Sequence, residues 1–357
     1  MFLSLLAIAA VLYLIQRYML DHSFDALSYR LELDRNCAEP DETVRFRTVL
    51  TNAKRLPLLF LRLREYIPGE MLVRNRKDGR ELRTEAYLGE AVLNQLFYIL
   101  SFQKVRRELE VSVPRRGRYL LGVSRLTCGD LLGISTSTKQ MQDIHELVIY
   151  PRRCDISGLV PALEGYLGDI SVQRFIMPDP IDTVGFREYT GREPMRDISW
   201  SKTLTSGKVM VRQYDYTAER KTGLIVDISD ADEESIEAAF STARSIADHL
   251  AKKNIAFSFY TNALILSRTA AEYYVPEGRG EKHLNKVKEI LGRASCTTAV
   301  PLAKLLDSVT QDRDMRKSFL LVSASGKERS ALLSKYEKRY GIRIMPVETG
   351  EGKGTYA

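Results

Sequence analysis

Cysteine is scarce in this sequence and is not arranged as a framework. The four cysteines form no CxxC pair and no cluster with the four histidines. A disulfide scaffold and a structural zinc site are therefore not expected, and separate thiols are typical of a reducing compartment. Proline and glycine follow no period, which excludes a collagen-like chain. The motifs Gly-x-Ser-x-Gly, His-Glu-x-x-His and the P-loop are also missing, so no catalytic residue is assigned.

His249 and Cys296 have reactive side chains, but no catalytic role is predicted for either residue. His249 falls in a predicted helix over 233–253 and is expected at the surface. Cys296 precedes Thr297, but no His or Asp partner can be named for it, so a buried and inert thiol is expected.

The composition is that of a globular protein with excess positive charge. The 357 residues are 44% hydrophobic and 28% charged, which excludes disorder of the whole chain and is enough for two domains. The mean hydropathy of −0.21 excludes a polytopic transporter. A net charge of +7 suits an anionic membrane surface or an acidic partner. Charge alone is weak support for nucleic acid, and no nucleic-acid or small-molecule ligand is expected.

The N-terminus carries a charge-free apolar stretch, Met1–Ile15, followed by Gln16 and Arg17. No Lys or Arg precedes it, unlike a secretory signal peptide. The stretch predicts a transmembrane anchor over residues 1–21, and the positive-inside rule then places the bulk of a single-pass protein in the cytoplasm. A buried core helix, or a segment that never spans, is the alternative.

Residues 22–150 are predicted to form an antiparallel β-sandwich, because short alternating runs are separated by turn signals. The predicted strands are 28–34, 43–50, 59–66, 91–102, 106–113, 117–127 and 145–150. Residues 151–221 are rich in charge, Gly and Pro and predict an irregular junction that ends in a strand over 208–214.

Residues 222–357 alternate between strands and helices, which predicts a mostly parallel sheet covered on both faces. The predicted strands are 223–227, 255–260, 319–322 and 341–347, and the helices are 233–253, 282–291, 299–309 and 330–340. Ligands of such sheets bind at the carboxyl ends of the strands.

The densest cluster of charged and aromatic residues runs from Gly185 to Lys202 and holds the single Trp of the chain. Cations and carboxylates alternate in it, which favours an internal ionic network over a phosphate-binding patch. We expect Arg187, Glu188, Arg196 and Trp200 to form a packed junction between the domains.

This cluster resembles the signature of the family called domain of unknown function 58 (DUF 58). Arg187-Glu188-Tyr189, Pro194-Met195-Arg196, Ile198 and Trp200 stand in register with the family segment, and Gly207–Arg212 matches the strand that follows it. Two shorter family motifs that precede the signature are resembled by Arg116–Tyr119 and Cys128–Gly133. The sequence departs from the family at Arg192-Glu193, where the family has Gly-Asp. The signature and interaction residues carried over are Arg187, Glu188, Tyr189, Glu193, Pro194, Arg196, Trp200, Lys202 and Arg212.

The resemblance also implies that residues 222–357 form a von Willebrand factor A-like domain. Such domains often bind a divalent ion through an Asp-x-Ser-x-Ser loop, a Thr and an Asp. The corresponding residues here are Asp227, Ser229, Asp230, Thr297 and Thr298. Ala231 and the carboxylate-free loop Ser323–Gly326 lack ligands that Mg²⁺ requires, so we interpret the site as degenerate and assign no cofactor. Asp230 or Asp232 as a helix cap is the competing interpretation.

The predicted fold is thus an N-terminal transmembrane helix, an antiparallel β-sandwich and a doubly wound A-like domain. The resemblance implies a membrane-anchored, non-enzymatic adaptor that works with a MoxR-type AAA+ ATPase in assembling or activating a protein complex. The alternative is a divalent-metal-dependent binding protein or enzyme that uses the Asp227 loop.

Overall fold

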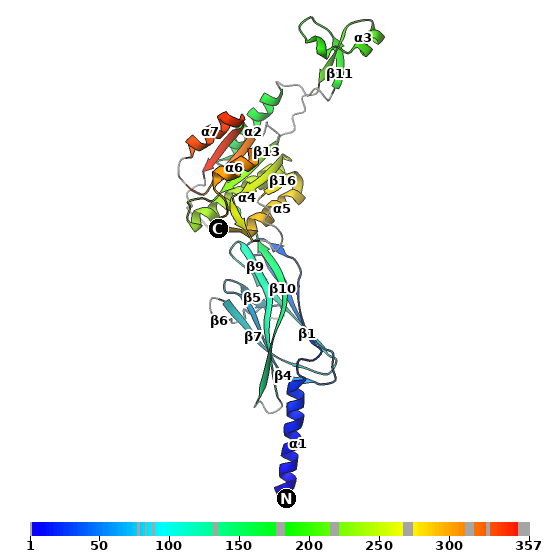
Figure 1. The fold of residues 1–357 in the computed structure, drawn as a ribbon, viewed down its shortest axis with the longest axis vertical. Helices are drawn as coiled ribbons and strands as arrows, with labels where there is room; N and C mark the ends of the chain where they lie inside the picture. Colours follow the sequence, from blue (N-terminus) through cyan, green and yellow to red (C-terminus); the bar gives the residue numbers. More distant parts are fainter. Residues whose placement is uncertain are drawn as a thin grey trace. The chain divides into compact units, whose positions relative to one another are not determined.

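The computed structural model describes residues 2–76, 79–82, 84–87, 90–130, 135–175, 183–214, 221–266, 274–310, 318–325 and 329–348. The chain divides into two compact units. The first comprises Met1–Arg152 with Ile265–Ala271 and Lys288–Ser295, and the second comprises Arg153–Leu264, Glu272–Val287 and Cys296–Ala357. Figure 1 labels the elements of both units.

The N-terminal helix α1 (Phe2–Asp21) corrects the predicted fold class. Among the described residues, no helix is long and apolar enough to cross a membrane, so the predicted transmembrane helix is wrong. The physical reason lies in the last turns of α1. The apolar stretch ends at Ile15, short of the ~20 apolar residues that a span needs, and Gln16 and Arg17 follow it. Arg17 forms an ion pair with Asp21 at 3.7 Å.

The first unit contains two β-sheets. The four-stranded sheet has the order β1 (Leu27–Leu33), β3 (Val44–Asn52), β8 (Lys104–Ser112) and β5 (Leu72–Asn75), and all its neighbours are antiparallel. The six-stranded sheet has the order β2 (Cys37–Ala38), β10 (Thr136–Ile149), β9 (Gly117–Gly129), β4 (Leu58–Pro68), β7 (Glu90–Ile99) and β6 (Glu85–Tyr87). Only the short β2–β10 pair is parallel within these described strands.

The two sheets share one hydrophobic core. Every second residue is buried from Leu27 to Leu31 in β1 and from Val44 to Asn52 in β3. The buried set joins Phe46 and Leu109 of one sheet to Leu61 and Leu126 of the other. This alternation is the period-2 pattern that the sequence shows. Each of the seven predicted strands lies on an observed strand, with the ends shifted by a few residues except in β10, which begins at Thr136.

One carboxyl group lies inside this core. Glu65 of β4 is 1% exposed, and its Oε1 accepts hydrogen bonds from Tyr29 Oη at 3.0 Å and Thr48 Oγ1 at 2.7 Å. Its Oε2 has no hydrogen bond to any described residue. Burial raises the pKa of Glu65 above its ordinary value, although the two hydroxyl donors and the charge of Arg107 act in the opposite direction.

The second unit contains a five-stranded sheet. Its order is β16 (Tyr274–Gly278), β14 (Ala256–Thr261), β13 (Lys221–Asp227), β18 (Ser318–Ser323) and β19 (Arg343–Glu348). β14, β13, β18 and β19 are parallel, whereas the edge strand β16 is antiparallel to β14. A separate two-stranded pair joins β15 (Ala263–Ile265) and β17 (Ala294–Thr298).

Helices cover both faces of this sheet. α6 (Leu302–Thr310) and α7 (Ser330–Tyr340) pack on the face that carries Ile225 and Leu321. Leu224 and Leu320 are the strand neighbours of Ile225 and Leu321, so they point to the other face of the sheet, and they are also fully buried. The helix α4 (Glu233–Lys252) contacts β13, β14 and β18. α5 (Gly280–Arg293) and α2 (Val160–Phe175) complete the helices drawn around the sheet in Figure 1.

Several local predictions for this unit need correction. α2 occupies part of the segment predicted to be irregular, because Gly165 and Gly168 disguise its helical pattern. β15, β16 and β17 were not predicted. α6 begins at Leu302, after Pro301, and not at Ala299, because proline is favoured at the start of a helix and its carbonyl accepts from Leu305 N.

Residues 183–214, which we call the signature hairpin, form a small folded segment. β11 (Thr183–Glu188) pairs antiparallel with β12 (Met210–Tyr214). Between them lie a 3₁₀ turn, η1 (Met195–Asp197), and the helix α3 (Trp200–Ser206), which ends at Gly207 with φ of +71°. Ile198 and Val211 are buried within the segment.

The buried carboxyl predicts a defined dependence of stability on pH. A raised pKa in the folded chain means that Glu65 keeps its proton on folding, so stability falls as pH rises from about 4.3, the unfolded value, through the folded pKa. Glu65→Gln mimics the protonated form and should remove this slope, which urea unfolding at a series of pH values measures. Glu81→Gln, at an exposed position, should retain it. An identical pH profile for Glu65→Gln and the unsubstituted chain would contradict a protonated Glu65.

Candidate functional site

The topology of the second unit defines where a ligand can bind. β13 lies between β14 and β18, so the chain winds away from β13 in opposite directions. A crevice forms at such a switch point, outside the carboxyl ends of the parallel strands. β13 ends at Asp227, β14 is followed by Asn262, and β18 ends at Ser323. These three strand ends define the candidate site.

Asp227 is the centre of the site and is fully buried. Its Oδ1 accepts three hydrogen bonds, from Ser229 N at 3.1 Å, Ser229 Oγ at 2.7 Å and Asn262 Nδ2 at 2.6 Å. Asn262 Oδ1 in turn accepts from Ile228 N at 2.9 Å. Asp227 therefore has one oxygen fixed entirely by neutral donors, and the loop after β13 is held by the same bonds.

The second oxygen of Asp227 faces a cation supplied by the chain itself. Arg329 Nη1 pairs with Asp227 Oδ2, and Arg329 Nη2 donates to Ser229 O at 3.0 Å. Arg329 immediately precedes α7, so one guanidinium joins the end of β13 to the start of a distant helix. Burial lowers the pKa of Arg329 from its ordinary value, yet an arginine so close to a carboxylate stays charged at neutral pH.

A cleft of about 710 Å³ opens beside this ion pair. Its lining is mainly small and aliphatic, with a polar edge formed by the β13 loop and Thr298. The lining residues are Ser229, Asp230, Thr298, Ala299, Val300, Pro301, Leu302, Ala303, Arg329, Ala331 and Leu332. The volume lies within the ~300–1,000 Å³ that is typical of ligand sites.

The predicted metal-site residues are brought only partly together. Asp227 and Ser229 are hydrogen-bonded, whereas Asp230 and Thr298 line the cleft. Thr297 is exposed and is not among the lining residues. In the third loop, Ala324 N donates to the carbonyl oxygen of Asp227 at 2.8 Å, and Gly326 lies outside the described residues.

These residues do not fit a divalent cation. Mg²⁺ prefers six oxygen ligands in an octahedral arrangement, and it cannot share Asp227 Oδ2 with a guanidinium. Within the described parts of the chain, no three His, Cys, Asp or Glu residues are grouped so as to hold a metal. Asp232 caps α4 by accepting from Ser235 N at 3.4 Å, so the cap belongs to Asp232 and not to Asp230.

Two residues of the site were not identified from the sequence. Asn262 directly follows an apolar strand, as Asp227 ends one. The same sequence pattern could therefore have identified Asn262 as a site residue. Arg329 belongs to the charged run Lys327-Glu328-Arg329 and has no distinguishing pattern. Only the three-dimensional fold brings it to Asp227.

The signature residues lie together in the signature hairpin. Arg187 pairs with Glu193 at 2.5 Å, and Lys208 pairs with Glu188 at 2.6 Å. Tyr189 N donates to Val209 O at 2.8 Å, and Pro194 precedes η1. Glu193 also accepts from Thr190 Oγ1 at 2.7 Å, and these contacts, the Thr190 hydroxyl first, lower the pKa of Glu193 to about 2.

Within the signature hairpin itself, Arg196 and Trp200 are not packed, and the junction between the domains stays a prediction. The Arg196 side chain is 85% exposed, and Trp200 is 60% exposed. Lys202 lies over the ring of Phe186 at 5.5 Å, and Arg212 is exposed. The alternating signs do produce ion pairs, and their cations Arg187, Arg196 and Lys208 are exposed.

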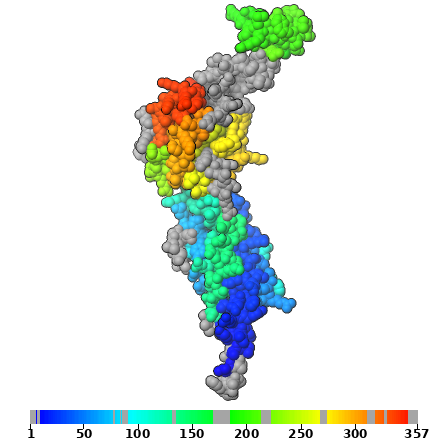
Figure 2. Space-filling view, in the orientation of Figure 1, coloured from blue at the N-terminus to red at the C-terminus, as the bar shows by residue number. Residues whose placement is uncertain are grey.

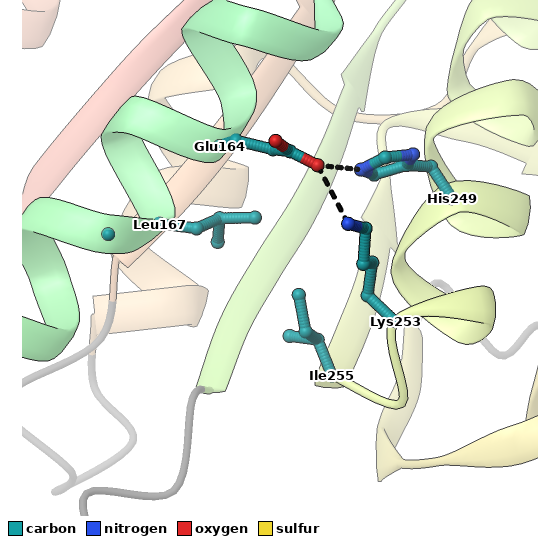
Figure 3. Close-up of a pocket in the computed structure, with 6 residues that line it drawn as sticks. Glu164, Leu167, His249, Lys253 and Ile255 are labelled. Carbon is teal, nitrogen blue, oxygen red and sulfur yellow. Dashed lines mark ion pairs between the residues drawn. The ribbon is translucent and has the colours of Figure 1, made fainter.

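A second pocket lies between α2 and α4 and has a volume of about 260 Å³. Figure 3 shows Glu164 of α2 facing two residues of the α4 end, with Oε1 at 2.9 Å from Lys253 Nζ and 3.8 Å from His249 Nε2. The prediction of a surface position for His249 is wrong, since its side chain is only 16% exposed. The space is smaller than a typical ligand site. Its charged residues attach α2 to α4.

Cys296 also departs from its predicted position. The prediction of a buried thiol is wrong, because Cys296 is exposed on β17, with Sγ 3.8 Å from Glu237 Oε1. It lies within β17, whose last three residues, Cys296–Thr298, are all exposed.

A family model described as "Protein of unknown function DUF58" matches residues 185–334. The matched range covers less than half of the chain and includes residues 185–214 of the signature hairpin and every residue that lines the larger cleft. The turn that resembles the family at Cys128–Gly133 lies upstream of the match, and its last three residues are outside the described part of the chain. No curated protein matches the sequence.

Several solved structures are similar over about a third to a half of the chain. A cohesin module from a Clostridium perfringens family 33 glycoside hydrolase is 8% identical, with 35% of this chain and 96% of that one covered and a TM-score of 0.27. The GAE domain of GGA2p from Saccharomyces cerevisiae is 11% identical, with 34% and 91% covered and a TM-score of 0.23. The sporulation control protein Spo0M from Bacillus subtilis is 14% identical, with 46% and 58% covered and a TM-score of 0.21. TM-scores this low support no conclusion about fold or function.

The Asp227–Arg329 pair predicts a large effect of single substitutions. Arg329→Met leaves a fully buried carboxylate without its cation and should lower the free energy of unfolding by about 3–5 kcal/mol. Adding Asp227→Asn to that variant removes the unpaired charge and should restore part of the loss. Urea unfolding followed by circular dichroism measures both effects. Lys338→Met, on the exposed side of α7, is the control and should change little; an equally small effect of Arg329→Met would show that the pair is not formed.

Proposed function

We propose that this chain is a non-enzymatic interaction protein that binds a partner protein through the cleft beside Asp227 and Arg329. The observation that carries the proposal is the internal neutralisation of the site. Asp227 is held by Ser229, Asn262 and Arg329, so its carboxylate is available neither as a general base nor as a metal ligand. What the cleft offers to a ligand is an aliphatic wall with a polar edge.

The lining supports a protein ligand in particular. Val300, Leu302 and Leu332 provide apolar surface, and Thr298 and Ser229 provide hydrogen-bonding groups at the margin. Interfaces combine an apolar centre and a polar rim in this way. A cleft of about 710 Å³ is large enough to receive two or three side chains of an inserted loop.

The resemblance to DUF 58 supports a more specific form of the proposal. It implies that the second unit is a von Willebrand factor A-like domain and that the partner is a MoxR-type AAA+ ATPase. The mostly parallel sheet with the Asp227 loop at its carboxyl edge is consistent with the first point. The second point rests on the resemblance alone; the family model includes all residues of the cleft, so the proposed binding surface lies inside the family segment.

The partner is tested with the MoxR-type ATPase encoded nearest to this gene in the same genome. The purified chain should bind that ATPase, and Ala331→Glu should raise the Kd at least tenfold, because it adds a charge to the exposed wall of the cleft. Ser334→Glu adds the same charge to α7 outside the cleft and should leave the Kd unchanged. Calorimetric titration measures both. Equal weakening by the two substitutions, or no binding at all, would contradict the proposal.

The metal-dependent alternative is tested on the chain alone. Titration with Mg²⁺ or Mn²⁺ should give no saturable heat, since Arg329 already occupies Asp227 Oδ2. Micromolar binding that disappears in Asp227→Ala would support the alternative function. The same titration of an unrelated exposed substitution, Asp25→Ala, controls for weak binding to surface carboxylates.

A further inference from the structure

The signature hairpin carries an apolar face that its own fold leaves uncovered. Met195 is 70% exposed, Trp200 is 60% exposed and Leu204 is 86% exposed. Trp200 and Leu204 are four residues apart in α3, so they lie on the same side of the helix, and Met195 belongs to the turn just before it. Figure 2 draws residues 183–214 as a compact green lobe.

The remainder of the hairpin holds α3 in place. A helix of seven residues is not stable alone in water, so its geometry must come from its attachments. Thr203 Oγ1 donates to Ser199 O at 2.9 Å and accepts from Met210 N at 3.0 Å, while Ser199 N donates to Met210 O at 2.8 Å. These bonds fasten one side of α3 to β12. Trp200 and Leu204 remain exposed on the fastened helix.

The charges around this face are unbalanced. Residues 183–214 contain six cations (Arg187, Arg192, Arg196, Lys202, Lys208 and Arg212) and three carboxylates (Glu188, Glu193 and Asp197). Each carboxylate already lies near a cation of the hairpin: Glu188 near Lys208, Glu193 near Arg187, and Asp197 at 3.9 Å from Arg196. The six cations less the three carboxylates leave an excess charge of +3 on this small surface.

We infer that this face is a second interaction surface and that it binds an acidic amphipathic helix of a partner protein. An apolar stripe with i, i+4 spacing on the partner would pack on Trp200 and Leu204, and carboxylates beside that stripe would meet Arg192, Arg196 and Lys202. Exposed Trp and Arg are the residues that contribute most to protein interfaces. A nucleic acid fits less well, because three carboxylates lie among the cations and would repel phosphates. The surface is independent of the cleft proposed above.

Trp200 is the single Trp of the chain, so intrinsic fluorescence reports on this surface alone. The probe is a synthetic helical peptide built from Leu and Glu heptads, and the control peptide has every Glu replaced by Lys. In the full chain, emission should begin at the long wavelength of a solvated indole and be quenched by acrylamide. The acidic peptide should shift the emission to shorter wavelength in a saturable way, and the basic peptide should not.

Substitutions connect the fluorescence change to the proposed face. Leu204→Ala should raise the Kd for the acidic peptide at least tenfold, and Arg196→Glu should do the same. Leu96→Ala removes a similarly exposed leucine, 72% accessible on β7, and should leave the Kd unchanged. Three outcomes would overturn the inference: indole emission that is already short-wavelength and protected from acrylamide, equal binding of both peptides, or tighter binding of a single-stranded oligonucleotide than of the acidic peptide.

Discussion

The pairing of Asp227 with Arg329 is the interaction on which the second unit depends. A carboxylate that is fully removed from water has a large desolvation cost unless a counter-charge and hydrogen bonds surround it. Here Ser229 and Asn262 satisfy one oxygen, and Arg329 compensates the charge on the other. Because Arg329 precedes α7 and Asp227 ends β13, the pair also sets where α7 begins relative to the central strand. The cleft wall formed by Ala331 and Leu332 follows from that placement.

The two units stabilise their buried carboxyl groups in different ways. In the β-sandwich, Glu65 accepts hydrogen bonds from two hydroxyl groups and lies near Arg107, and burial raises its pKa. In the parallel sheet, Asp227 has a guanidinium in direct contact. The difference reflects topology. The carboxyl edge of a parallel sheet collects loops from distant parts of the chain, so a cation from a remote loop can reach it, whereas the core between the two antiparallel sheets is formed mainly by strand residues.

Periodic patterns in the sequence predicted most of the longer elements, whereas α2 and the short strands β15, β16 and β17 were missed. Alternation in β1, β3 and β4 and the apolar face of α4 each depend on neighbours in the chain, and the structure confirms them. Asp227 and Ser229 were likewise identified because a strand end is visible in the sequence. Arg329 was not, because its partner is separated from it by several strands and helices. The exposure of Trp200 and Cys296 could not be predicted from the sequence either, because the burial of a residue depends on which other parts of the chain pack on it.

The guanidinium at Asp227 has a consequence for when the cleft is ready to bind. Arginine keeps its proton across the physiological pH range, and a covalently attached cation is never diluted or chelated. The shape of the cleft therefore does not follow the supply of divalent ions or modest acidification, as it would if a soluble ion held the same carboxylate. Under the proposed function, the occupancy of the cleft is set by the abundance and the state of the partner.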